Sequence, residues 1–127
     1  MIINTPVSLG ELIDKISILR IKQKKIDNKN KLIYINEELF LLESTLSASI
    51  KDKKIEEYLK DLIKINSELW KIEDDIRDCE RCKKFDQRFI DLARAVYFTN
   101  DQRSQIKLNI NNLFGSKIVE VKSYEKY

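Results

Sequence analysis

The scarcity of helix-breaking residues is the feature that most restricts the fold of this sequence. Its 127 residues include only two glycines and one proline, whereas 35% are Asp, Glu, Lys or Arg. Sheet proteins need frequent turns, and turns depend on glycine and proline. We therefore expect an all-α fold of long helices. With 43% hydrophobic residues, the chain can bury a core as a single domain over residues 1–127.

Apolar residues recur at helical spacing over five segments. The first follows a capping box at Ser8–Glu11, and turn-forming residues at Asp27–Asn30 separate it from the second, so that the two form a helical hairpin. A serine-rich stretch, Ser44–Ser49, predicts the next turn. The five segments are residues 8–26, 32–46, 55–82, 86–97 and 99–115.

The predicted architecture is bundle-like, with the N-terminal hairpin, one long central helix and two short C-terminal helices. Apolar residues cover more than half the circumference of segment 86–97, which is typical of an enclosed helix. A second capping box at Thr99–Gln102 predicts a new helix start, and Gly115 its end. Residues 116–127 form a less regular tail.

Several classes of site are disfavoured by composition. The chain has no histidine, and its lone C-x-x-C pair, Cys79 and Cys82, lies inside a predicted helix without further zinc ligands. We therefore expect no metal and no cofactor. Acidic and basic residues are interspersed at a net charge of +3, which disfavours nucleic acid. No apolar run is long enough for a membrane span and no leader pattern is present, so we expect no membrane association and a cytoplasmic location.

Arginine is distributed unevenly along the chain. Five of the six arginines lie between Arg77 and Arg103, although the chain has eighteen lysines. Guanidinium grips carboxylate or phosphate with a defined two-pronged geometry. Arg103 falls in an apolar seam with Lys107 beside it, and on the long helix a half-buried stripe at i, i+4, i+7 and i+11 contains Asn66, Trp70, Glu73 and Arg77.

Two interpretations of these residues remain open. The first is an internal salt-bridge network, in which Glu73, Glu80 or Asp101 pairs with Arg77 and Arg103. The second is a shallow pocket that grips an anionic small molecule, with aromatic walls. The candidate ligand-binding residues are Trp70, Glu73, Arg77, Arg94, Tyr97, Arg103 and Lys107.

A set of short strings resembles an uncharacterised family of small, all-helical bacterial proteins, a domain of unknown function. The strings extend over nearly the whole chain: Gly10–Ile16, Glu68–Arg77, Phe85–Tyr97, Thr99–Arg103, Gly115–Ser116 and Glu120–Tyr124. The resemblance implies a bacterial domain and supplies no catalytic residues. Relatives near sugar-transfer and surface-polysaccharide enzymes are a further, weaker implication.

Two functional hypotheses follow, and neither names a reaction. One is a non-catalytic helical interaction or anion-binding module. The other is a small helical enzyme acting on a phosphorylated or carboxylated metabolite, linked to nucleotide-sugar or polysaccharide metabolism. We also expect a homodimer, because the longest helix outruns the hairpin and the first helix carries apolar residues, Ile18 and Ile21, on a second side.

Overall fold

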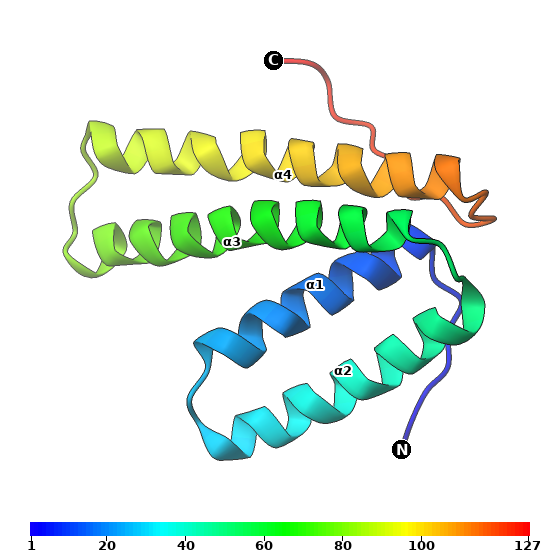
Figure 1. Ribbon diagram of the computed structural model, residues 1–127. Helices are drawn as coiled ribbons and strands as arrows, with labels where there is room; N and C mark the ends of the chain where they lie inside the picture. Colours follow the sequence, from blue (N-terminus) through cyan, green and yellow to red (C-terminus); the bar gives the residue numbers. More distant parts are fainter.

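The protein consists of four helices and no strands, in a computed structural model that describes residues 1–127. The all-α prediction is confirmed. Two antiparallel hairpins lie across each other, and an extended C-terminal tail follows the second hairpin (Figure 1). The helices are α1 (Leu9–Lys25), α2 (Lys29–Ser49), α3 (Lys54–Arg81) and α4 (Gln87–Leu113).

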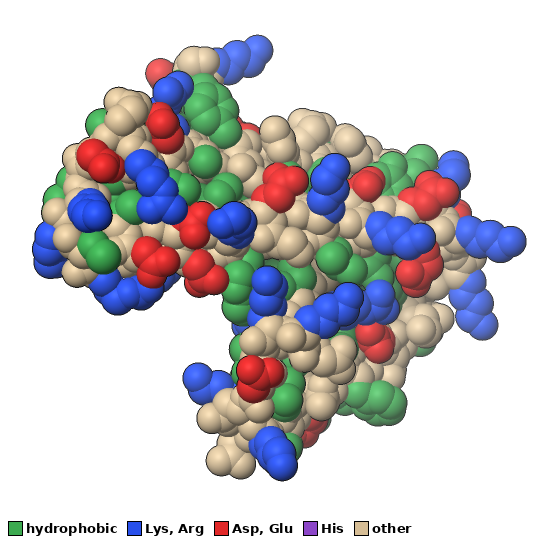
Figure 2. All heavy atoms as spheres, turned by 60° about the vertical axis from the view of Figure 1, so that its left-hand side comes forward, with side chains coloured by type: hydrophobic (Ala, Val, Ile, Leu, Met, Phe, Trp, Pro, Cys, Tyr) green, Lys and Arg blue, Asp and Glu red, His purple; other side chains and the backbone are tan.

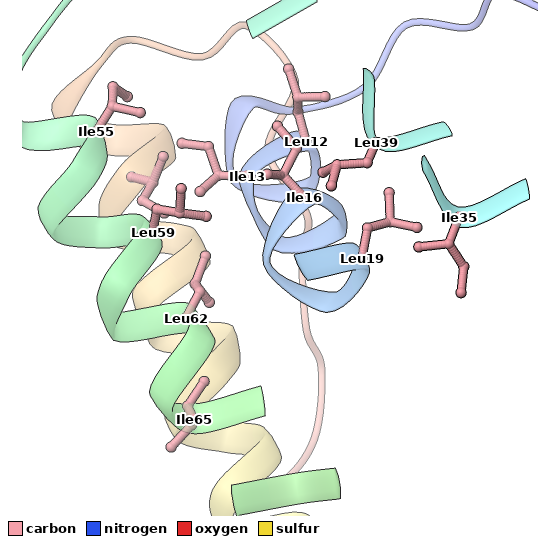
Figure 3. Close-up of a cluster of buried hydrophobic side chains, with 11 residues drawn as sticks. Leu12, Ile13, Ile16, Leu19, Ile35, Leu39, Ile55, Leu59, Leu62 and Ile65 are labelled. Atoms are coloured by element: carbon pink, nitrogen blue, oxygen red, sulfur yellow. The ribbon is translucent and has the colours of Figure 1, made fainter. Parts of the chain in front are cut away.

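Helix α1 is the centre of the fold. It packs against all three other helices, whereas α2 contacts only α1. Ile13 and Ile16 of α1 are completely buried and meet Leu59 and Leu62 of α3, with α2 on the opposite side of α1 (Figure 3). The sequence predicted that the longest helix, α3, lies at the centre of the fold. The central helix is instead the shortest one, α1. Because α1 is enclosed on several sides, Ile21 is buried and Ile18 is partly buried.

Side-chain caps start three of the helices, and those at Ser8 and Asp86 stand where the predicted segments begin, whereas α2 starts three residues before its predicted start. The Ser8 hydroxyl accepts from the Glu11 amide at 3.1 Å, and the Asn28 and Asp86 side chains accept from the amides three residues later. At the end of α4, Gly115 adopts a left-handed φ of 66°, and the Ser116 amide donates to the Asn111 carbonyl at 2.8 Å. This is the predicted C-terminal stop.

The prediction of two short C-terminal helices is wrong, because α4 continues through Thr99–Gln102 without a break. The expected cap side chains have other partners. The Asn100 amide oxygen accepts from Arg103 at 3.2 Å, and the Asp101 carboxylate accepts from the Tyr127 hydroxyl. Packing along α3 outweighs the weak preference of these residues for a helix start.

The turn predicted at Ser44–Ser49 is also displaced, because α2 runs to the end of this stretch. The hydroxyls of Ser44, Thr45 and Ser49 donate to carbonyls four residues earlier, at 2.7 to 3.0 Å. These bonds keep the side chains inside the helical pattern. The chain reverses instead at residues 50–53.

The outer part of the second hairpin, residues 67–98, is poorly covered, and we call it the distal half. Only Cys79 is buried there, and the hairpin extends beyond α1 and α2 (Figure 1). Segment 86–97 was expected to be enclosed, but Phe85 and Ile90 are about half exposed. The only helix beside this part of α4 is α3, which explains the difference (Figure 1).

Candidate functional site

A buried carboxylate, Asp14, joins three helices. Its side chain is only 1% exposed, and it receives the Arg103 guanidinium of α4 through a pair of hydrogen bonds, of which Nε to Oδ1 measures 2.9 Å. Asn66 of α3 donates its amide to the same Oδ1 at 2.9 Å and to the Ser17 hydroxyl at 2.8 Å. The hydrogen bonds to the Asp14 carboxylate and the surrounding negative charge raise the pKa of Arg103.

A lysine extends this cluster toward the tail. Lys107 Nζ lies 2.7 Å from Glu11, 3.1 Å from Glu120 and 4.0 Å from Asp14. Burial acts to lower the pKa of Lys107, but its hydrogen bonds to Glu11 and Glu120 prevail and raise that pKa. Lys122 and then Lys107 lower the pKa of Glu120. We call these seven residues the Asp14 cluster: Glu11, Asp14, Ser17, Asn66, Arg103, Lys107 and Glu120.

Close backbone contact brings α1 and α4 together beside the cluster. A methyl group at Gly10 would lie 2.6 Å from the Lys107 carbonyl oxygen, so only glycine fits here. The Gly10 amide donates to Asn111 at 2.7 Å and the Leu9 amide to Ser116 at 3.2 Å. The free amides of the first turn of α1 are therefore satisfied by the end of α4.

A pocket lies between α4 and the C-terminal tail, and we call it the tail pocket. Its volume is about 990 Å³, and it adjoins the Asp14 cluster because Glu120 belongs to both. The tail folds over it at Tyr127, whose ring packs on Tyr97 and Phe98 with centroids 5.4 and 4.7 Å away. The Asp101 carboxylate accepts from the Tyr127 hydroxyl and raises the pKa of Tyr127 to about 12.

Comparison with known proteins places the chain in a family. The sequence model of a family of unknown function (DUF6165) matches residues 3–127. The chain belongs to the DUF6165 family. No curated protein and no solved structure matches it. The resemblance to an uncharacterised family is thereby confirmed.

Two of the predicted site residues of this DUF6165 member, Arg103 and Lys107, meet in the Asp14 cluster. The expected acceptors of Arg103 were Glu73, Glu80 or Asp101, and this expectation is wrong, because its acceptor is Asp14. An aspartate in the apolar sequence around Ile13 and Ile16 was the available signal. Asp14 and Ser17 stand three residues apart there, so they lie on one side of α1.

The other predicted residues lie elsewhere on the DUF6165 fold. Arg77 pairs with Glu73 on the surface of α3, as the network interpretation expected, but it is eleven residues beyond Asn66, or about 16 Å along the helix. Arg77 and Arg103 therefore do not form a single anion-binding site. Trp70 is half-buried on the same helix. Arg94 is exposed with its guanidinium 5.7 Å from the centre of the Phe98 ring, and Tyr97 lines the tail pocket.

Two further observations describe the DUF6165 member as a whole. None of its helices combines the length and apolar character needed to cross a membrane. No three Cys, Asp or Glu side chains converge in a way that could hold a metal ion.

Proposed function

We propose that this chain is a non-catalytic binding module that takes a small polar ligand in the tail pocket. The observation that carries the proposal is the pocket itself, about 990 Å³ in volume and lined by fourteen residues of α4 and the tail. This volume is at the upper end of the range typical of small-molecule sites. The Asp14 cluster borders the tail pocket at Glu120 and holds that side of the pocket in place.

The ionic cluster supports binding rather than acid–base catalysis. A general acid or base works best with a pKa near the operating pH. Contacts within the cluster raise the pKa values of Arg103 and Lys107, and Lys122 together with Lys107 lowers the pKa of Glu120. Each of these shifts moves the pKa of the group away from neutrality. No buried side-chain nitrogen or oxygen lacks a hydrogen-bond partner. The cluster therefore has the character of a structural network.

The lining of the tail pocket favours an uncharged polar ligand over an anion. Asn100, Ser104 and Gln105 present amide and hydroxyl groups from one side of α4, and three tyrosines, 97, 124 and 127, supply flat apolar walls. The charged lining residues nearly balance, with Asp101, Glu120 and Glu125 against Lys122 and Lys126. Hydroxyl and amide partners together with aromatic faces suit a polyhydroxylated ring such as a sugar.

Titration with a panel of neutral mono- and disaccharides tests the proposal, with amide chemical shifts as the readout. We expect shifts confined to residues 97–108 and 119–127. Inorganic phosphate and citrate form the second arm, because the anion-binding hypothesis predicts shifts with these probes instead. Shifts produced only by the anions would replace the neutral-ligand assignment. If no probe shifts these residues at millimolar concentration, the binding-module proposal is wrong.

A pair of substitutions on α4 locates the ligand. Ser104→Trp fills the tail pocket and is expected to abolish the sugar-dependent shifts. Gln102→Ala is the matched control, because Gln102 is exposed on the same helix and does not line the pocket. Equal binding by both variants would place the ligand elsewhere.

A further inference from the structure

The distal half of the second hairpin lacks the cover that the rest of the fold has. Helix α1 is covered by α2, α3 and α4. No further helix packs across residues 67–98, and only Tyr127 of the tail reaches them, at Tyr97 and Phe98. Figure 2 shows the surface hollowed beneath the end of this hairpin, beside the α1–α2 hairpin. Two helices alone bury too little apolar surface for stability, and the usual solution is a bundle of four.

The uncovered side is the continuation of the side that α1 occupies. On α3, Trp70 follows by one turn Asn66, which bonds to Asp14 of α1. On α4, Val96 and Phe89 precede Arg103, the other partner of Asp14, by two and four turns. Trp70, Phe89 and Val96 are all only half-buried, so their apolar surface is incompletely covered. Aromatic side chains of this kind are typical of the centre of a protein interface.

Charge on the distal half is divided between its two helices. Residues 67–81 of α3 carry six acidic and three basic side chains, whereas residues 82–98 carry four basic and two acidic ones. A twofold axis that sets each α3 against the α4 of a second copy would bring the segment with net negative charge to the one with net positive charge. The same surface patch then serves both partners, as a closed symmetric dimer requires.

The size of this surface fits such an association. Fifteen residues of α3 extend about 22 Å, and two neighbouring helices are about 20 Å wide. The face is therefore roughly 450 Å² on each copy, or about 900 Å² in total before side-chain relief is counted, which is the size of a weak, transient interface. We infer that the distal halves of two copies of this chain pack together as an antiparallel four-helix bundle.

Sedimentation equilibrium from about 1 to 500 μM, the range of a weak to moderate dimer, tests this inference. The mass is expected to rise from 15.1 kDa toward twice that value. Trp70 is the only tryptophan, so its emission should move to shorter wavelength, and its quenching by acrylamide should fall, over the same concentrations. A monomer throughout, or a dimer that leaves Trp70 unchanged, overturns the inference.

Substitution of one aromatic on each hairpin identifies the face. Phe89→Asp should raise the dimer dissociation constant at least tenfold with unchanged helical circular dichroism. Phe40→Asp is the matched control, because Phe40 is an exposed aromatic on α2, away from the distal half. Glu73→Arg provides a second variant at an exposed surface ion pair and should also weaken the dimer. Weakening by Phe40→Asp alone would place the interface on α2 and overturn the inference.

Discussion

Asp14 shows how one polar residue can organise an apolar core. Its side chain is almost completely shielded from solvent, yet it lies between Ile13 and Ile16 in the sequence of α1, among buried hydrophobic residues. Burial of a carboxylate without partners costs several kcal/mol, and the guanidinium of Arg103 with the amide of Asn66 offsets that cost. The three groups come from three helices, so they fix how the helices meet.

Removal of the Asp14 carboxylate should therefore be severe. We expect Asp14→Ala to lower the free energy of unfolding by about 3–5 kcal/mol, because Arg103 and Asn66 lose their shared acceptor. Urea denaturation measures the change. Asp74→Ala, at an exposed site on α3, is the control and should stay within about 0.5 kcal/mol of the parent protein. If Asp14→Ala lowers the free energy of unfolding as little as the control does, the Asp14 cluster contributes little to stability.

Gly10 tests the contact between α1 and α4 directly. Alanine is normally the better helix former by about 1 kcal/mol, but its methyl group would here meet the Lys107 carbonyl oxygen at 2.6 Å. We expect Gly10→Ala to destabilise by about 1–3 kcal/mol, because the two helices must separate. Thermal unfolding provides the measurement. A variant more stable than the parent would mean that α1 and α4 do not approach this closely.

At the scale of single elements, sequence patterns located helices better than they located helix ends. The helix starts at Ser8 and Asp86 and the stop at Gly115 follow local rules, and these rules held. The break at Thr99 did not occur, because packing against α3 acts over the whole length of α4. Arg103 and Lys107 could be singled out within one helix, but their partner Asp14 is about ninety residues earlier, beyond the reach of spacing arguments.

Because α4 is continuous, alanine substitutions at Ser8 and at Thr99 should change the free energy of unfolding in opposite directions. At a true N-cap such as Ser8, alanine should cost about 1 kcal/mol. At Thr99, inside the helix, alanine should be neutral or stabilise by a few tenths of a kcal/mol, because it has the higher helix propensity. Chemical denaturation of Ser8→Ala and Thr99→Ala compares them. Equal losses of stability in the two variants would indicate that a helix does begin at Thr99.

The tail should detach in acid. Lys122 and Lys107 lower the pKa of Glu120 in the folded protein. The contribution of ionised Glu120 to the stability of the folded tail is therefore complete above its ordinary pKa of 4.5. This contribution is lost as the pH falls from 4.5 through the lowered pKa. NMR relaxation of residues 118–127 should show increased mobility over this interval.

A substitution isolates the contribution of Glu120 to this transition. Glu120→Gln should have a mobile tail already at pH 7, with little further change on acidification. Glu125→Gln, at an exposed tail position, should keep the transition of the parent protein. A tail that stays ordered in the Glu120→Gln variant would contradict the role of the Lys107 contact.

At the scale of the whole molecule, stability is divided unevenly between two regions. The buried residues concentrate where α1 crosses α3 and α4, and the distal half contains only one. We expect amide hydrogen exchange in dilute solution to be slowest in residues 12–19 and clearly faster in residues 70–80 and 88–98. Exchange in the distal half should slow at high protein concentration. Uniform protection at all concentrations would show that both regions open together.

The placement of Asp14 also has a consequence for synthesis. The aspartate leaves the ribosome well before Arg103 and Lys107, which are added about ninety residues later. At ordinary elongation rates of about 5–20 residues per second, the carboxylate spends roughly 5–20 seconds without its permanent cations. During that interval α1 cannot be buried in its final form, because an unpaired charge would go with it. We therefore expect the final burial of α1 to wait until α4 has been made.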